Sequence, residues 1–264
     1  MSISKKEPNK NFHLAMQDRN NFLPNLSVEC VIFGYHNKEL KALCSQLKNT
    51  NLWTLPGGLV GKDENLEDAV HRILEERTSI KGLFLKEFGV FGDKDRSLSK
   101  TNFPAHISPL DPSEAEKSQW IVNTRLVSIS YYALTEFSKV QPQPSFIYSE
   151  SSWVNVDELP PMVLNHQQMV PEALKTLRRQ LHHEPIGLNL LPEKFTISEL
   201  QVLYETILNR KLDTRNFVKK LQYLEILTKL DEKKSIGGHR SPILYKFNKR
   251  AYNKALKNED QLFF

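Results

Sequence analysis

A glycine pair, a charged helix and an arginine are spaced along residues 57–80 in a way that suits phosphate chemistry. Gly57 and Gly58 follow the apolar run 52–55, which predicts a strand followed by a turn that tolerates unusual backbone angles and close ligand approach. An amphipathic helix is predicted next, with Asp63 as its N-cap and an apolar stripe along one side. Its other side carries acids and arginine, which are groups that bind metal ions or anions.

This spacing resembles the Nudix box, a loop-helix-loop that holds a metal ion against a diphosphate. The matching positions are Gly58, Glu64, Arg72, Leu74, Glu76 and Ile80. The resemblance implies three carboxylates around magnesium, but Ile73 and Arg77 replace two of them and only Glu76 remains. Isoleucine cannot bind magnesium, and Arg77 brings positive charge to the place of the metal. We therefore predict a Nudix fold with a degenerate box, no catalytic residues, no metal and no cofactor.

Composition and charge indicate a globular chain with a basic C-terminal part. The 264 residues are 39% apolar and 25% charged, which suits one large domain or two modest ones. Residues 1–170 carry a net charge of −2 and residues 171–264 carry +7, which favours nucleic acid as a partner; a tail that only adds solubility stays open. No segment resembles a signal peptide or a membrane span, so a soluble, cytoplasmic protein without a membrane partner is predicted.

The domain boundaries follow from the strand and helix patterns. Strands are predicted at 27–35, 42–47, 83–89 and 127–134, and an aromatic-led strand from Trp153 ends the sheet. The prediction is a flexible lead-in at 1–25, a mixed-sheet domain at 26–165, a connecting helix at 166–184, a helical DNA-binding domain at 185–250 and a tail at 251–264. The loop 93–123 is unusually long for a compact domain, and it is predicted to be mobile or to act as a lid.

Candidate effector-binding residues lie in and after the box. Asp93, Asp95 and Arg96 resemble the stretch that follows the box in one branch of the Nudix family, although a solvated turn is an open alternative. His166 opens a helix that runs to Gln180, where it either contacts a ligand or serves as a cap or surface group. The full set of candidate effector-binding residues is Arg72, Arg77, Asp93, Asp95, Arg96 and His166.

The C-terminal domain has helix-turn-helix spacing, with helices predicted at 196–208 and 213–224. Thr196 and Glu199 form a predicted capping box, and Asp213 or Thr214 caps the second helix. That helix should bury Phe217, Leu221 and Leu224 and expose a polar face, and a basic glycine turn between two strands forms a wing. Candidate DNA-binding residues are Thr214, Arg215, Asn216, Lys219, Lys220, Lys233, Lys234, His239 and Arg240. A helical protein-interaction module is the alternative.

The chain from about residue 26 to 250 resembles the Nudix-related transcriptional regulators. The resemblance implies an α+β, α-β-α Nudix-fold domain with a mixed sheet, followed by a winged helix-turn-helix domain, in a homodimer that binds a double-stranded DNA operator. Its effector would be ADP-ribose-like or a sugar such as L-arabinose, and the operon would serve sugar or NAD-related metabolism. The lack of metal ligands favours a neutral sugar, while Arg77 could instead hold a phosphate.

Two other functions stay open. An active, magnesium-dependent Nudix pyrophosphohydrolase acting on ADP-ribose-like nucleoside diphosphates would need another base, such as Glu64, Glu75 or an acid in the long loop. A sugar- or nucleotide-binding protein that does not bind DNA would be insensitive to changes in the basic wing.

Overall fold

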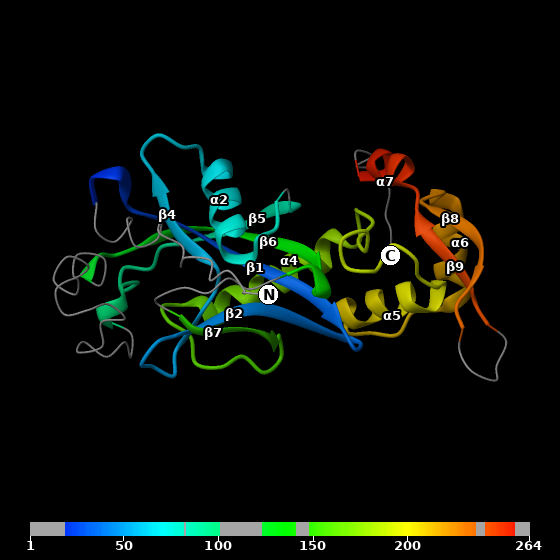
Figure 1. Ribbon diagram of the computed structural model, residues 1–264, viewed down its shortest axis with the longest axis horizontal. Helices are drawn as coiled ribbons and strands as arrows, with labels where there is room; N and C mark the ends of the chain where they lie inside the picture. Colours follow the sequence, from blue (N-terminus) through cyan, green and yellow to red (C-terminus); the bar gives the residue numbers. More distant parts are fainter. Residues whose placement is uncertain (1–18, 82, 101–122, 141–147, 236–240, 257–264) are drawn as a thin grey trace, which may run out of the picture. The chain divides into compact units, whose positions relative to one another are not determined.

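The computed structural model describes residues 19–81, 83–100, 123–140, 148–235 and 241–256 (Figure 1). The described chain divides into two compact units. The first is formed from residues up to 33, 41–134 and 138–173, and the second from 34–40, 135–137 and residues from 174 onwards. The long helix that starts at His166 is divided between them, with Ala173 in the first unit and Leu174 in the second.

In the described residues, the first unit is built on one branched sheet, and the second contains the end of the divided helix, three further α-helices and a two-stranded sheet. The strands are β1 (Phe22–His36), β2 (Glu39–Leu47), β3 (Trp53–Thr54), β4 (Gly57–Gly61), β5 (Leu85–Phe91), β6 (Val127–Glu136), β7 (Tyr148–Asn155), β8 (Leu227–Lys233) and β9 (Ile243–Phe247). The α-helices are α2 (Leu66–Thr78), α4 (His166–Gln180), α5 (Ile197–Leu208), α6 (Thr214–Leu224) and α7 (Lys249–Leu256). Short 3-10 helices are η1 (Arg19–Asn21), η2 (Leu98–Lys100) and η3 (Phe137–Lys139).

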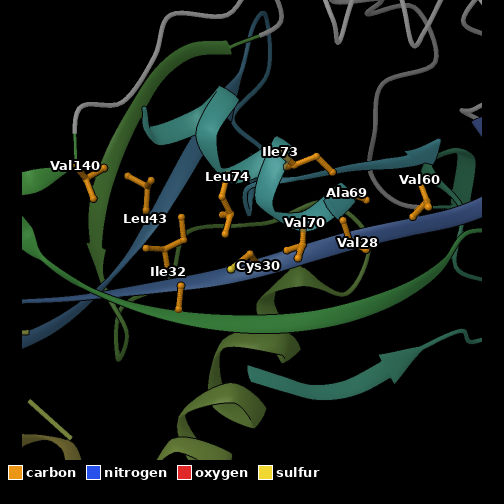
Figure 2. Close-up of a cluster of buried hydrophobic side chains, with 11 residues drawn as sticks. Val28, Cys30, Ile32, Leu43, Val60, Ala69, Val70, Ile73, Leu74 and Val140 are labelled. Carbon is orange, nitrogen blue, oxygen red and sulfur yellow. The ribbon is translucent and has the colours of Figure 1, made fainter. Parts of the chain in front are cut away.

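The two faces of β1 have different chemistry. Val28, Cys30 and Ile32 pack in an apolar cluster with Val70 and Leu74 of α2, as Figure 2 shows. Because side chains alternate along a strand, Glu29 points to the opposite face, where its Oε1 lies 3.8 Å from Nε2 of His166 at the start of α4. The sheet path runs β3-β2-β1-β6-β5, with β4 added to β1 and β7 to β2. Both faces of β1 are therefore buried, and Glu29 is a carboxyl group on a face that also carries the buried side chains of Val31 and Phe33.

The β4 segment departs from the predicted turn. Gly57 and Gly58 lie within the strand, and Gly187 is the only glycine in the described chain with positive φ. The prediction of a turn at this pair is therefore wrong, and the reason for Gly57 is space. A Cβ built there would lie 1.6 Å from Glu29 Oε2 and 2.9 Å from the Val28 carbonyl oxygen. Glycine lets the carboxyl group of its strand partner lie directly over β4.

Two element boundaries in the first unit also differ from prediction. β1 begins at Phe22, so residues 22–25 are strand and not lead-in, because Phe22 pairs with Gly61 and neighbouring leucines pack on the core. Helix α2 begins at Leu66 with Asn65 as its extended N-cap, not Asp63. The intervening turn is held by Glu64, whose Oε1 accepts a hydrogen bond from the Gly61 N–H at 2.6 Å.

The second unit has the predicted helix-turn-helix and wing. Thr196 and Glu199 complete the capping box of α5, and Asp213 caps α6 by accepting from the Asn216 N–H. Strands β8 and β9 pair antiparallel to form the wing (Figure 1). Residues 251–256 are helical and not a tail, because α7 buries Tyr252 and Ala255, and the Tyr252 hydroxyl donates to the Pro185 carbonyl. None of the described helices is long and apolar enough to cross a membrane.

Candidate effector site and nucleic-acid interface

Arg72 holds the loop before α2 in place. Its Nε donates to Glu64 Oε2 at 2.9 Å, and its Nη2 donates to the Leu59 carbonyl at 3.1 Å. Its Nη1 lies 3.7 Å from Glu76 Oε1. The hydrogen bond from Arg72 lowers the pKa of Glu64, as expected for a carboxylate kept ionised. The guanidinium group thus stabilises the box itself, and its role toward an effector stays a prediction.

The two residues that replace carboxylates in the box have structural roles. Ile73 is buried in the apolar cluster beside Gly58. Arg77 is also buried, and its guanidinium carbon lies 5.0 Å from the centre of the Tyr148 ring, a cation–π contact. Magnesium needs several oxygen ligands, and these side chains offer a methyl group and a positive charge instead. The residues present do not fit the magnesium site that the box resemblance implies.

A buried polar cluster lies on the other face of the sheet, around Glu29. Burial raises the pKa of Glu29 to about 7, although Arg96, hydrogen bonds from Ser27 and Ser128, and Arg77 each lower it. Ser128 Oγ lies 3.5 Å from Glu29 Oε1. Two predicted effector-binding residues, Arg77 and Arg96, therefore place their charges near one acid that was not predicted. The sequence signal for Glu29 is a lone carboxylate within the largely apolar segment 28–33 of β1.

His166 is fixed as the neutral tautomer that carries its proton on Nε2. Its Nδ1 accepts from the Leu55 N–H at 3.1 Å and lies 3.2 Å from the Thr54 hydroxyl. Its Nε2 is buried, has no hydrogen-bond partner in the described chain and lies 3.8 Å from Glu29 Oε1, too far for a hydrogen bond. The surface position that the sequence left open for His166 is wrong, because the side chain is only 2% exposed. The ring does not cap its own helix either, because Nδ1 bonds to Thr54 and Leu55 instead.

Arg96 is held by two hydrogen bonds and keeps one nitrogen unused. Its Nε donates to Asn165 Oδ1 at 2.6 Å, and its Nη1 donates to the Leu126 carbonyl at 3.1 Å. Its Nη2 is buried and has no partner among the residues that the structure describes. Burial lowers the pKa of Arg96, while Glu29 and Asp93 raise it. Arg96 is thus a pre-positioned cation with a hydrogen-bond donor to spare.

The remaining predicted effector residues lie at the surface. Asp93 is exposed and accepts from Asn165 Nδ2 at 3.5 Å, so it contacts the same asparagine that holds Arg96. Asp95 is exposed and pairs with Lys100. Most of the loop predicted at 93–123 lies outside the described residues, and the predictions for that part stay untested. In the described chain, no group of three His, Cys, Asp or Glu side chains is arranged to hold a metal ion.

The buried histidine predicts a particular dependence of stability on pH. Burial, together with Arg96, lowers the pKa of His166 from 6.5 to about 3. Below pH 6.5 His166 is protonated in the unfolded chain but stays neutral in the folded chain. The free energy of unfolding therefore falls as the pH falls towards 3. Glu29 acts oppositely between pH 7 and 4.5, because there the folded chain binds the extra proton.

We expect the stability advantage of the wild type over His166→Gln to shrink by up to about 1.4 kcal/mol per pH unit below pH 6.5. Urea unfolding of both proteins from pH 8 to 4 measures it, and Glu29 cancels in the comparison to first order. His71→Gln, which changes a partly exposed histidine of α2, is the control. A difference that stays constant with pH would show that His166 takes up its proton at the same pH in the folded and the unfolded protein, which contradicts the lowered pKa.

A hydrogen-bonded clamp on α5 sets the start of α6. Glu205 Oε1 accepts from the Leu212 N–H at 3.0 Å and from Gln201 Nε2 at 3.0 Å. Gln201 also donates to the Leu212 carbonyl and to the Thr214 hydroxyl. The backbone hydrogen bond from Leu212, with Lys211 and Gln201, lowers the pKa of Glu205 to about 2, so the acceptor is ionised. The clamp fixes the turn, and with it the direction of α6.

The predicted DNA-binding residues differ in their exposure and in whether they already bond to other side chains. Phe217, Leu221 and Leu224 are buried as predicted. The exposed candidates in the described chain are Thr214, Arg215, Asn216, Lys219, Lys233 and Lys234, while Lys220 is half-buried. Thr214 already accepts from Gln201, and Lys234 pairs with Glu199. His239 and Arg240 lie outside the described residues. Arg215, Asn216 and Lys219 therefore make the exposed polar face of α6.

The fold and these sites define a two-part protein, with a Nudix-type domain that lacks the metal ligands and a winged helix domain with a basic helix. The NUDIX domain family model matches residues 24–179, and the model of the NrtR DNA-binding winged helix domain matches residues 187–247. The chain belongs to the Nudix family, in the group whose NUDIX domain is followed by an NrtR-type winged helix domain.

Proteins that match most of the chain agree with this assignment. The chain is 28% identical over 238 residues to the ADPR responsive transcriptional repressor NtrR of Acinetobacter baylyi. The matched region covers 87% of this chain and 84% of that protein. The crystal structure of Shewanella oneidensis NrtR complexed with a 27mer DNA is 25% identical, with a TM-score of 0.67 over 86% of this chain and 95% of that chain. A MutT/nudix family protein from Enterococcus faecalis, 20% identical, shares the fold with a TM-score of 0.60 over 94% and 100% of the two chains.

Proposed function

We propose that this protein is a transcriptional repressor whose winged helix domain binds operator DNA and whose Nudix domain binds an ADP-ribose-like effector. The observation that carries the proposal is the exposed face of Arg215, Asn216 and Lys219 on a helix whose start is clamped by Gln201 and Glu205. Arginine pairs with guanine, asparagine pairs with adenine, and lysine neutralises phosphate, so this face suits the major groove.

The effector part of the proposal is supported by the buried cluster and by the relative. Hydrolysis needs metal ligands that this box lacks, whereas Arg96 and His166 offer buried donors that a bound molecule can use. The Acinetobacter protein is described as ADPR responsive, which favours ADP-ribose over the free pentose that the missing metal ligands favoured. ADP-ribose carries both phosphates and pentose hydroxyls, so it suits a site with arginine, histidine and a carboxylate.

The proposed mechanism is thermodynamic linkage. If the effector and the operator prefer different arrangements of the dimer, each weakens the binding of the other by the same factor. The chain offers continuous elements for this coupling, because β1, β6 and α4 each contribute residues to both compact units. A homodimer is part of the proposal, because two recognition helices related by a two-fold axis suit an operator with two half-sites.

Fluorescence anisotropy with a labelled duplex from the protein's own promoter region tests the proposal. We expect saturable binding that weakens steeply with salt, a lower affinity for scrambled duplex, and a loss of affinity of about 5- to 150-fold at saturating ADP-ribose. L-arabinose and AMP serve as comparison ligands. Equal affinity for scrambled duplex would contradict the repressor, and magnesium-dependent release of AMP from ADP-ribose would favour the pyrophosphohydrolase instead.

A further inference from the structure

The buried cluster contains two hydrogen-bond donors that nothing in the described chain accepts. They are Arg96 Nη2 and His166 Nε2, on side chains that are 4% and 2% exposed. Both side chains are locked, Arg96 by Asn165 and Leu126 and His166 by the backbone N–H of Leu55. A buried donor without an acceptor costs free energy, so two held in fixed positions beside one acid indicate a site for a molecule that accepts hydrogen bonds.

The nearby acid, Glu29, determines what kind of molecule can use these two donors. Glu29 lies 3.8 Å from His166 Nε2 and is electrostatically coupled to Arg96, so a molecule that uses the two donors also meets this carboxyl group. A phosphate accepts from both donors but places its negative charge against a buried carboxylate. A hydroxyl group accepts from the donors and donates to the carboxylate, which satisfies every group in the cluster.

The position of Glu29 also suits a pair of hydroxyl groups. Its Oε1 lies toward His166 and Ser128, while its Oε2 lies over the bare Cα of Gly57, where any side chain would collide with it. A carboxylate held in this way presents two acceptor atoms, and neighbouring hydroxyls on a pentose ring can donate to both.

We propose that Glu29 is an effector-binding residue and that, with Arg96 and His166, it binds neighbouring hydroxyl groups of a pentose ring and not a phosphate. The proposal rests on the proposed function for the existence of an effector, and it names the part of that effector that the cluster binds. It also gives Gly57 a role, because any larger residue would move the carboxylate.

Isothermal titration of the full chain at pH 8 tests the proposal with ADP-ribose, D-ribose, L-arabinose and inorganic pyrophosphate as separate ligands. We expect Glu29→Gln to lower the affinity for ADP-ribose by about 10- to 100-fold, because a charge-assisted hydrogen bond is lost. Glu29→Asp, which keeps the charge but shortens the reach, should also lose affinity. Glu87→Gln, which changes an exposed acid on β5, is the matched control and should bind like the wild type.

The direction in which Glu29→Gln changes the affinity shows whether the cluster binds a hydroxyl group or a phosphate. A phosphate beside Glu29 would be repelled by the carboxylate, so tighter binding of ADP-ribose or pyrophosphate by Glu29→Gln would overturn the proposal. Unchanged affinity of Glu29→Gln for ADP-ribose would also overturn it. Thermal unfolding and operator binding report whether each variant is folded, and Glu29→Asp carries the test if Glu29→Gln does not fold. Wild-type binding of a free pentose but not ADP-ribose, lost in the Glu29 variants, would overturn the proposed effector and support this inference. Absence of binding to all three pentose-containing ligands would overturn both.

Discussion

Arg96→Met is expected to lower the free energy of unfolding by about 3 kcal/mol and to lower effector affinity by at least about 100-fold. The side chain is buried and makes hydrogen bonds to Asn165 Oδ1 and to the Leu126 carbonyl. It is also the main positive charge that lowers the pKa of Glu29 against the effect of burial. Methionine fills much of the same volume, so the loss reflects the missing charge and hydrogen bonds more than a cavity.

A second substitution separates the two effects. In Arg96→Met, Glu29 is a buried acid without its arginine, and Glu29→Gln in the same chain removes that acid. We expect the double variant to be more stable than Arg96→Met in urea unfolding at pH 8, but to bind the effector no better than Arg96→Met. Arg125→Met, which changes an exposed arginine that donates to the Gly92 carbonyl, should alter neither quantity by much. Full effector affinity in Arg96→Met would remove the cluster from the effector site.

The helix-turn-helix could be predicted from the sequence because its determinants are local. The capping box joins Thr196 to Glu199 within one turn, and the spacing of Phe217, Leu221 and Leu224 marks the buried face of one helix. Each of these signals spans fewer than a dozen residues. The structure confirms the capping box and the buried face, and both could be predicted because neither depends on residues far away in the sequence.

The polar cluster could not be predicted as a unit, because its members come from distant segments. Glu29 is at the middle of β1, Arg96 follows β5 and His166 opens α4. Burial on both faces of β1 removes the alternation of polar and apolar residues that reveals which side chains share a face. The role of Gly57 was mistaken for the same reason, since the constraint on it is the side chain of a residue in the paired strand.

The box shows the opposite case, in which correct spacing did not determine the roles of the residues. Glu64 and Arg72 stand at the expected positions, and they bind each other and stabilise the turn before α2. Arg77 turns into the interior against Tyr148, where its charge lowers the pKa of Glu29. A substitution that removes a metal ligand has thus placed a positive charge near the proposed effector site.

Arg215→Ala is expected to weaken operator binding by about 1–3 kcal/mol, or about 5- to 150-fold, and to relax sequence preference at one base pair in each half-site. The residue is exposed in the first turn of α6, the part of a recognition helix that meets base edges. Its backbone position depends on the Asp213 cap and the clamp on α5, which the substitution leaves intact. Anisotropy with matched and single-mismatch duplexes measures both effects.

Lys219→Ala provides the contrast that identifies base contact. Lys219 is exposed one turn further along α6 and is expected to contact phosphate, so its loss should weaken binding to all duplexes alike and reduce the slope of log affinity against log salt by about 1. Arg250→Ala, which changes an exposed arginine of α7, controls for the loss of one positive charge in the same domain. If Arg215→Ala instead behaved like Lys219→Ala, Arg215 would contact the DNA backbone, and base recognition would fall to Asn216 or to the wing. Unchanged binding by Arg215→Ala and Lys219→Ala would exclude both residues of α6 from the DNA interface.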